Sequence, residues 1–234
     1  MKQVIAMHGW AGSSATWNHW QSVLESNGWC WSNGDRGYDG SPPHDPSWST
    51  HADRRVLIAH SMGWHLVSES TLAQADELVL LASFGRFVPD GRAGRRLITG
   101  LEGMTRRLEE GDGIAMLERF FAQVAHPYAA SALPPSKLIL DGLSPAGRDR
   151  LEADLRHLAA TQGLPPGRPD QARILLVQGG ADAVVTAETH QSLVQDLHNH
   201  GYGDISHCND PGWGHAVVTP PVLSRVMAWL DQDA

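Results

Sequence analysis

The chain has 234 residues, a length typical of one domain with a sizeable hydrophobic core. Hydrophobic residues make up 41% and charged residues 19%, which argues against a disordered or fibrous chain, and no run of apolar residues is long enough to predict a membrane span. The net charge of −8 argues against general affinity for nucleic acid, because binding to phosphates requires a basic surface.

The N-terminal segment and the cysteines indicate the compartment. Residues 1–8 become polar too early for a secretory signal, so we expect a cytoplasmic protein. Cys30 and Cys208 lie far apart in the sequence and lack metal-ligand spacing. We therefore expect neither a disulfide framework nor a zinc site, and we expect both side chains to be buried.

Residues 1–83 combine apolar strands with helices. The predicted strands are the apolar runs 4–7, 56–59 and 77–81. A helix is predicted at 15–26, with Trp17, Trp20, Val23 and Leu24 on one face, and a shorter helix at 62–75. Continuous apolar strands that alternate with helices predict an α/β fold with a mostly parallel central sheet flanked by helices.

Residues 84–168 have a different composition. Helical spacing of apolar residues and the lack of a convincing buried strand predict a helical lid inserted after the middle strands. Residues 86–168 hold 12 of the 18 Lys and Arg side chains, against 10 acidic ones, so the segment has a charge of +2 and the remainder −10. This asymmetry is compatible with an acidic partner, and equally with a solvated helical surface.

Residues 169–234 return to the composition of the first block, so we assign 1–83 and 169–234 to one core. A strand is predicted at 173–180, a helix at 187–199 and a closing helix at 221–231.

Ser61 has the sequence context of a nucleophile elbow. It follows an apolar strand and precedes a helical segment, and the small residues Ala59 and Gly63 lie two positions before and after it. In such a turn the serine hydroxyl is exposed at the end of a strand. Ala59 stands where glycine is usual, and a strand-to-helix turn often contains Ser and Gly for structural reasons, so the pattern alone is a weak signal.

The remaining members of a catalytic triad follow in the order acid and then histidine. Asp182 follows the predicted strand at 173–180, and His215 lies shortly before the closing helix. A histidine must accept the serine proton and a carboxylate must orient that histidine, so Ser61, Asp182 and His215 are the predicted catalytic residues. Each also has a structural alternative: Asp182 as a turn residue, and His215 as one of 13 histidines without a catalytic role.

Two backbone N–H groups are candidates for an oxyanion hole. The donors in this layout come from the residue after the serine and from the loop after an early strand, which here are Met62 and Trp10. We expect His8 and Gly9 to shape that loop, and His60 and His65 to pack near the elbow.

These residues together resemble the α/β-hydrolase family over nearly the whole chain. The resemblance rests on the His8-Gly9-Trp10 loop, the segment 35–41, Ser61, Asp182 and His215. Within the family the chain is most similar to the pimeloyl-acyl-carrier-protein methyl ester esterases of biotin synthesis, through this loop and the stretch Leu117-Glu118-Arg119-Phe120-Phe121. The resemblance implies a cytoplasmic serine esterase that uses no cofactor and no metal and releases methanol from a substrate carried by acyl carrier protein.

The resemblance also implies roles in substrate binding. Arg119 is expected to contact the acidic carrier or its phosphopantetheine, and Phe120 to line the channel for the acyl chain. Independently of the resemblance, Trp10 lies near the predicted site loops and is expected to line the pocket, with core packing as the alternative. Alternatively, Arg119 only pairs with a neighbouring acid on its helix. Other basic residues are candidates for carrier contacts without a residue-by-residue match: Arg92, Arg95, Arg96, Arg106, Arg107 and Lys137.

One segment of the chain departs from the usual pattern of the family. The connection from Asp35 to Ser61 is short and rich in Pro, Ser and His, so the helix that usually precedes the elbow strand is in doubt.

Several other functions fit the same residues. They are another short-chain carboxylesterase, a thioesterase, a lyase, and a ligand receptor on a hydrolase scaffold. Epoxide hydrolase and haloalkane dehalogenase chemistry is disfavoured because those enzymes use an aspartate at the elbow.

Overall fold

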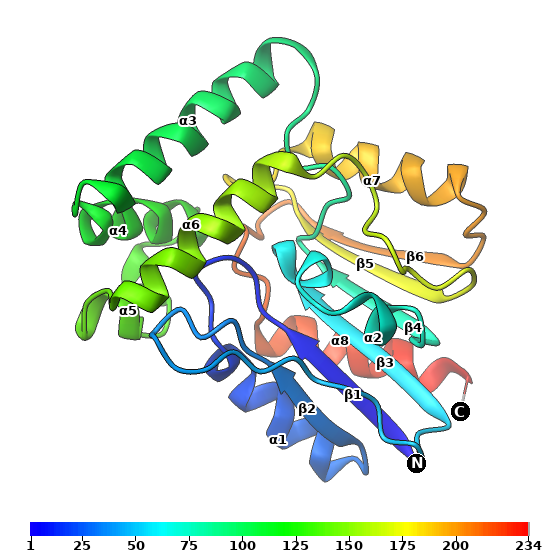
Figure 1. Cartoon of the computed structure of the whole chain (residues 1–234). Coiled ribbons are helices and arrows are strands. Elements are labelled where there is room, and N and C mark those ends of the chain that lie inside the picture. The colour runs from blue at the N-terminus through cyan, green and yellow to red at the C-terminus, as the bar shows by residue number, and fades with distance from the viewer. Residues whose placement is uncertain (234) are drawn as a thin grey trace.

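A computed structural model describes residues 1–233 and contains a six-stranded sheet (Figure 1). The order across the sheet is β2-β1-β3-β4-β5-β6, and every neighbouring pair of strands is parallel. The strands are β1 (Lys2–Met7), β2 (Cys30–Gly34), β3 (Arg54–His60), β4 (Glu77–Leu81), β5 (Arg173–Gly179) and β6 (Ile205–Asp210). The predicted parallel sheet is confirmed.

Helices cover both faces of the sheet because the central strands are apolar on both sides. They are α1 (Asn18–Ser26), α2 (Glu69–Leu72), α7 (Ala187–Asn199) and α8 (Pro220–Leu230). Val56 and Ile58 of β3 pack with α1 and α8, whereas Leu57 and Ala59 pack with α2 and α7. In Figure 1, α8 is seen behind β3, and α7 lies above β5 and β6.

The helix predicted at 15–26 buries the expected face. The 3₁₀ turn η1 (Ser14–Trp17) leads directly into α1, and Trp17, Trp20 and Leu24 are buried against the sheet.

Three details differ from the sequence prediction. The prediction of one helix over 62–75 is wrong. The chain forms a 3₁₀ turn, η2 (Ser61–His65), then a break, and then the short helix α2. The Ser68 hydroxyl caps the first turn of α2. Strand β6 was not predicted, and β2 was not among the predicted apolar runs, because both are edge strands of mostly polar, partly exposed residues. The expectation that both cysteines are buried is also wrong, because Cys30 is exposed.

The doubt about a helix before the elbow strand was justified. In the described part of the chain, the connection from β2 to β3 contains turns and an isolated bridge between Asp35 and His44, but no helix.

The segment between β4 and β5 forms a group of helices beyond the carboxyl ends of the strands (Figure 1). It contains α3 (Gly91–Glu109), α4 (Gly113–Ala125), the 3₁₀ turn η3 (Ala130–Ala132), α5 (Lys137–Leu140) and α6 (Pro145–Ala160). Their apolar faces form a hydrophobic cluster with Trp10, Tyr38 and Met62 of the sheet-end loops. No helix within residues 1–233 combines the length and the hydropathy needed to cross a membrane.

A buried ion pair fixes α6 to the loop that follows β2. Arg36 donates two hydrogen bonds to Asp154, at 2.8 and 2.7 Å, and the Tyr38 hydroxyl donates a third, at 2.7 Å. Asp154 is only 4% exposed, so its carboxylate depends on these donors to replace water. One turn earlier on α6, Arg150 donates to the carbonyl groups of Gly37 and Ser41.

We predict that Asp154→Ala lowers the free energy of unfolding by about 2 to 3 kcal/mol, because it leaves Arg36 and the Tyr38 hydroxyl without their buried acceptor. Urea denaturation monitored by tryptophan fluorescence measures the change. The matched control is Asp149→Ala, at an exposed aspartate of the same helix. Equal effects of the two substitutions would contradict a structural role for the buried network.

Candidate active site

Ser61 occupies a strained position at the end of β3. Its φ is 56°, in the left-handed region that side chains other than glycine rarely adopt. Ser61 is 8% exposed and is the first residue of the turn η2. Strain of this kind is retained where the surroundings impose it, and it is frequent at functional sites.

Two glycines bring the loop after β1 against Ser61. A Cβ atom on Gly63 would overlap the carbonyl oxygen of Met7, and one on Gly9 would lie 2.9 Å from the Cβ of Ser61. Both positions therefore require glycine. Ala59 fits where glycine is usual, because it lies within β3 and is fully buried in the hydrophobic core.

His215 is held by a buried carboxylate. Its Nδ1 donates to Oδ2 of Asp182 at 2.8 Å, and Oδ1 of Asp182 accepts from the backbone N–H groups of Val184 and Val185 at 2.7 and 2.8 Å. Burial raises the pKa of Asp182, but His215 and the backbone donors outweigh burial, so the pKa lies below its ordinary value. An ionised Asp182 fixes the proton of a neutral His215 on Nδ1, which leaves Nε2 as a proton acceptor.

Ser61 and His215 line the same cavity, which has a volume of about 1470 Å³. The cavity lies between the loops at the carboxyl ends of the strands and the helices α3 to α6. Within residues 1–233 no hydrogen bond joins Ser61 to His215. In enzymes, the hydrogen bond between a nucleophile and its general base is often long before substrate binds and shortens in the complex.

The other residues predicted for the site also line this cavity. Trp10 and Met62, the two oxyanion-hole candidates, lie in its wall, together with Arg119 and Phe120. Trp10 meets Phe120 edge to face, with ring centroids 4.9 Å apart, and its indole N–H donates to the carbonyl of Leu151 on α6 at 2.9 Å. Apolar side chains from the helices complete much of the wall: Leu97, Leu101, Met104, Met116, Phe121, Leu155 and Leu158.

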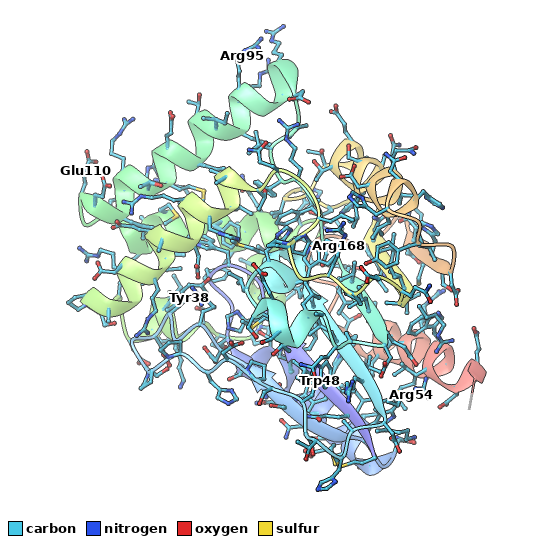
Figure 2. The ribbon with its side chains drawn as sticks, turned by 45° about the vertical axis from the view of Figure 1, so that its right-hand side comes forward. Tyr38, Trp48, Arg54, Arg95, Glu110 and Arg168 are labelled. Atoms are coloured by element: carbon cyan, nitrogen blue, oxygen red, sulfur yellow. The ribbon has the colours of Figure 1, made fainter. Side chains whose placement is uncertain are left out.

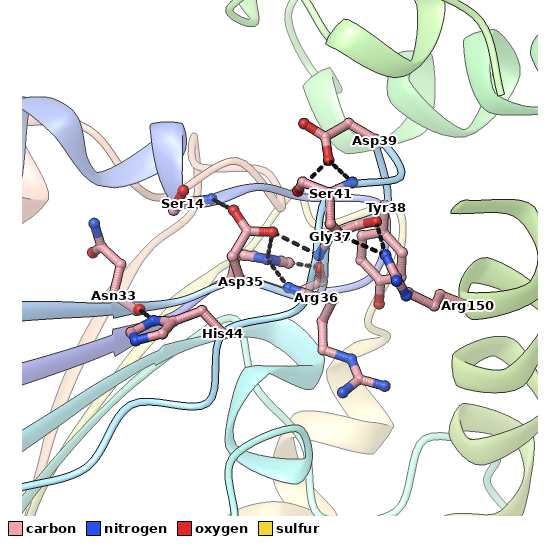
Figure 3. Close-up of polar contacts among 12 residues, drawn as sticks. Ser14, Asn33, Asp35, Arg36, Gly37, Tyr38, Asp39, Ser41, His44 and Arg150 are labelled. Atoms are coloured by element: carbon pink, nitrogen blue, oxygen red, sulfur yellow. Dashed lines mark hydrogen bonds and ion pairs between the residues drawn. The ribbon is translucent and has the colours of Figure 1, made fainter. Parts of the chain in front are cut away.

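The loop that carries Trp10 is held in shape by His8 and Asp35. Nδ1 of His8 donates to the carbonyl of Gly9 at 2.8 Å, and Nε2 accepts from the Arg36 backbone at 3.2 Å. Asp35 accepts from the backbone N–H groups of Ser14 and Gly37, at 2.8 Å each (Figure 3). Burial raises the pKa of Asp35, but the neighbouring His8 ring and the hydrogen bonds from Ser14 and Gly37 outweigh burial and hold the pKa well below its ordinary value.

Two further histidines lie close to the His215–Asp182 pair. The His60 ring lies 4.9 Å from that of His215, and its Nε2 donates to the His215 carbonyl at 2.9 Å. His190, on α7, places Nε2 4.0 Å from Oδ2 of Asp182. The sequence analysis did not single out His190, because nothing local distinguishes it among the 13 histidines.

His65 packs beside the elbow, as expected. It stacks on Phe84 and donates from Nε2 to the Phe84 carbonyl at 2.9 Å. In the described residues, no group of three or more His, Cys, Asp or Glu side chains has an arrangement that would hold a metal ion.

Comparisons with known proteins identify the fold. No protein-family model and no curated protein matches the amino-acid sequence. Solved structures do match: the esterase EaEST from Exiguobacterium antarcticum has a TM-score of 0.70 at 14% identity and covers 99% of this chain and 92% of its own. A bromoperoxidase from Bacillus anthracis has a TM-score of 0.67 at 16% identity over 97% and 91% of the two chains. The enol-lactonase from Burkholderia xenovorans LB400 has a TM-score of 0.70 at 13% identity over 99% and 92%.

These likenesses, together with the parallel sheet, show that the chain has the α/β-hydrolase fold. The predicted fold class is confirmed. At such low identities the likeness defines the fold, and the activity has to be argued from the site itself.

We predict that stability falls as the pH decreases from 7 to 5. Burial lowers the pKa of His60 to about 3 and that of His65 to about 4, so the unfolded chain binds protons below pH 6.5 that the folded protein does not. Each histidine then contributes a loss of about 2 kcal/mol over this interval. His65→Gln should reduce this loss of unfolding free energy between pH 7 and pH 5 by about 2 kcal/mol, measured by urea denaturation at several pH values.

The matched control for this measurement is His19→Gln, at an exposed histidine of α1. An unchanged loss of unfolding free energy in His65→Gln would show that His65 is not a source of the acid sensitivity.

Proposed function

We propose that the protein is a serine carboxylesterase in which Ser61, His215 and Asp182 form the catalytic triad. The observation that carries the proposal is that a serine with positive φ, at the end of a central strand, shares one cavity with a histidine that donates to a buried aspartate. This arrangement of nucleophile, base and orienting acid is the one that ester hydrolysis requires.

In the proposed reaction, Oγ of Ser61 attacks the ester carbonyl carbon while Nε2 of His215 accepts the hydroxyl proton. The backbone N–H groups of Trp10 and Met62 stabilise the oxyanion that forms on the carbonyl oxygen. The carbon–oxygen bond to the alkoxy group then breaks, and His215 returns its proton to the leaving alcohol. Water attacks the acyl-enzyme by the same route in reverse and regenerates Ser61.

We further propose that the substrate is the methyl ester of pimeloyl-acyl-carrier protein, a cytoplasmic substrate, and that methanol is the leaving alcohol. The resemblance of the His8-Gly9-Trp10 loop and of residues 117–121 to esterases of biotin synthesis supports this assignment. A large cavity with many apolar side chains in its wall is compatible with an acyl chain.

The position of Arg119 supports the proposal that the substrate is carried by an acidic protein. Arg119 is exposed on α4 at the cavity wall, and within residues 1–233 it forms no ion pair, so the alternative that it only pairs with a neighbouring acid is not favoured. A free guanidinium beside a substrate cavity is suited to steer an acidic carrier protein into place.

We predict that Ser61→Ala lowers kcat by about 10⁴- to 10⁶-fold without a change in folding, because it removes the nucleophile. Release of methanol from pimeloyl-acyl-carrier-protein methyl ester and hydrolysis of p-nitrophenyl butyrate are measured in parallel. Ser131→Ala is the matched control, because Ser131 lines the same cavity without a proposed catalytic role. Near-normal turnover by Ser61→Ala would contradict the esterase mechanism.

The two substrates separate the alternatives. Ser61-dependent hydrolysis of the free ester alone would leave an esterase with a different substrate. Hydrolysis of neither substrate would favour a ligand receptor on a hydrolase scaffold.

We predict that Arg119→Glu lowers kcat/KM for the carrier-bound ester by about 10-fold and leaves p-nitrophenyl butyrate hydrolysis within about 2-fold, because only the carrier is acidic. Arg168→Glu is the control: it makes the same charge change at an arginine between α6 and β5 that does not line the cavity and is not a candidate for carrier contacts (Figure 2). Equal losses on both substrates would reject a role for Arg119 in carrier docking.

A further inference from the structure

His190 is a buried histidine with an unsatisfied nitrogen beside the proposed triad. Its side chain is 7% exposed, and Nε2 has no hydrogen-bond partner in the described chain. The nearest carboxylate oxygen is Oδ2 of Asp182, at 4.0 Å, and this is the same oxygen that accepts from His215. An unpartnered buried nitrogen costs free energy, so its placement against a carboxylate requires an explanation.

The position on α7 favours a neutral imidazole. His190 lies in the first turns of that helix, where the positive end of the helix dipole disfavours a second positive charge. Burial also lowers the pKa of His190 below its ordinary value, although the charge of Asp182 acts in the opposite direction.

The carboxylate determines which nitrogen of His190 carries the proton. If Nε2 were unprotonated, its lone pair would face the negative oxygen of Asp182, which is repulsive. The tautomer with the proton on Nε2 instead directs an N–H dipole at that oxygen.

We propose that His190 is a positioning residue that directs its Nε2–H at Asp182 and thereby restrains the carboxylate that orients His215. The inference rests on the proposed triad. Two backbone N–H groups occupy Oδ1 of Asp182, and His215 and His190 approach Oδ2, so the carboxylate is restrained at both oxygens.

This arrangement has a consequence for the base. A second N–H directed at Asp182 stabilises its negative charge and so weakens its pull on a proton at His215. His190 thereby helps His215 to remain unprotonated, and able to act as a base, at lower pH. The titratable groups that act on His190 are Asp182, from the loop after β5, and His215, from the loop before α8, while His60 of β3 acts on His215.

The test compares His190→Phe, which removes the N–H, with His190→Gln, whose amide nitrogen can replace it. His190→Met is a second apolar variant in case the Phe protein does not fold, and His198→Phe, at an exposed histidine of the same helix, is the control. The pKa of His215 is read by NMR titration of its imidazole, with the signal assigned by its loss in His215→Asn. The acid limb of kcat/KM for p-nitrophenyl butyrate is measured alongside.

In His190→Phe and His190→Met, we expect the NMR pKa of His215 and the pKa of the acid limb of kcat/KM to rise by about 0.5 to 1 pH unit. In His190→Gln and His198→Phe, both pKa values should stay near those of the wild type. An unchanged His215 pKa in both apolar variants would overturn the proposal, even if kcat decreased. If the wild type hydrolyses no ester but the NMR pKa still shifts, the esterase proposal fails while the role of His190 stands.

Discussion

The close approach of the loop after β1 to the turn at Ser61 is the constraint on which the site depends. Met7 and Ala59 are paired in the register of β1 and β3, so the two strands end side by side and direct their loops to one point. Gly9 and Gly63 allow the backbones to meet there, and Ser61 adopts its left-handed conformation in the same contact. The sheet register therefore determines where the candidate nucleophile and the candidate oxyanion donors lie.

The helices over the sheet ends are held in two different ways. Polar contacts attach α6: its Asp154 binds Arg36 and Tyr38, and its Leu151 carbonyl accepts from the Trp10 indole. The helix α3 packs on both α4 and α6, and these helices share a cluster of apolar side chains with the sheet-end loops. One wall of the cavity is thus fixed to the loop that carries the oxyanion candidate, and the other is shaped by hydrophobic contact.

The electrostatics of the site follow from several buried histidines around one carboxylate. Burial lowers the pKa values of His60 and His190, so neither competes with His215 for the proton that the proposed mechanism places there. Of these three histidines, as residues 1–233 place them, His215 is the one that donates a hydrogen bond to Asp182, and this carboxylate can stabilise a positive charge on His215. In the proposed reaction the proton from Ser61 therefore has a single destination.

The sequence by itself determined the strands β1, β3, β4 and β5, because each is a continuous apolar run, and with them the fold class and the order of Ser61, Asp182 and His215 along the chain. It did not reveal β6, whose residues are polar because the strand lies at an edge of the sheet. It also did not reveal the break after η2, because the helical spacing of apolar residues continues across that break. Only the tertiary structure decided that Asp154 meets Arg36 and that His190 faces Asp182. These contacts join residues 118 and 8 positions apart, and their strength comes from shared burial rather than from any local pattern that a sequence displays.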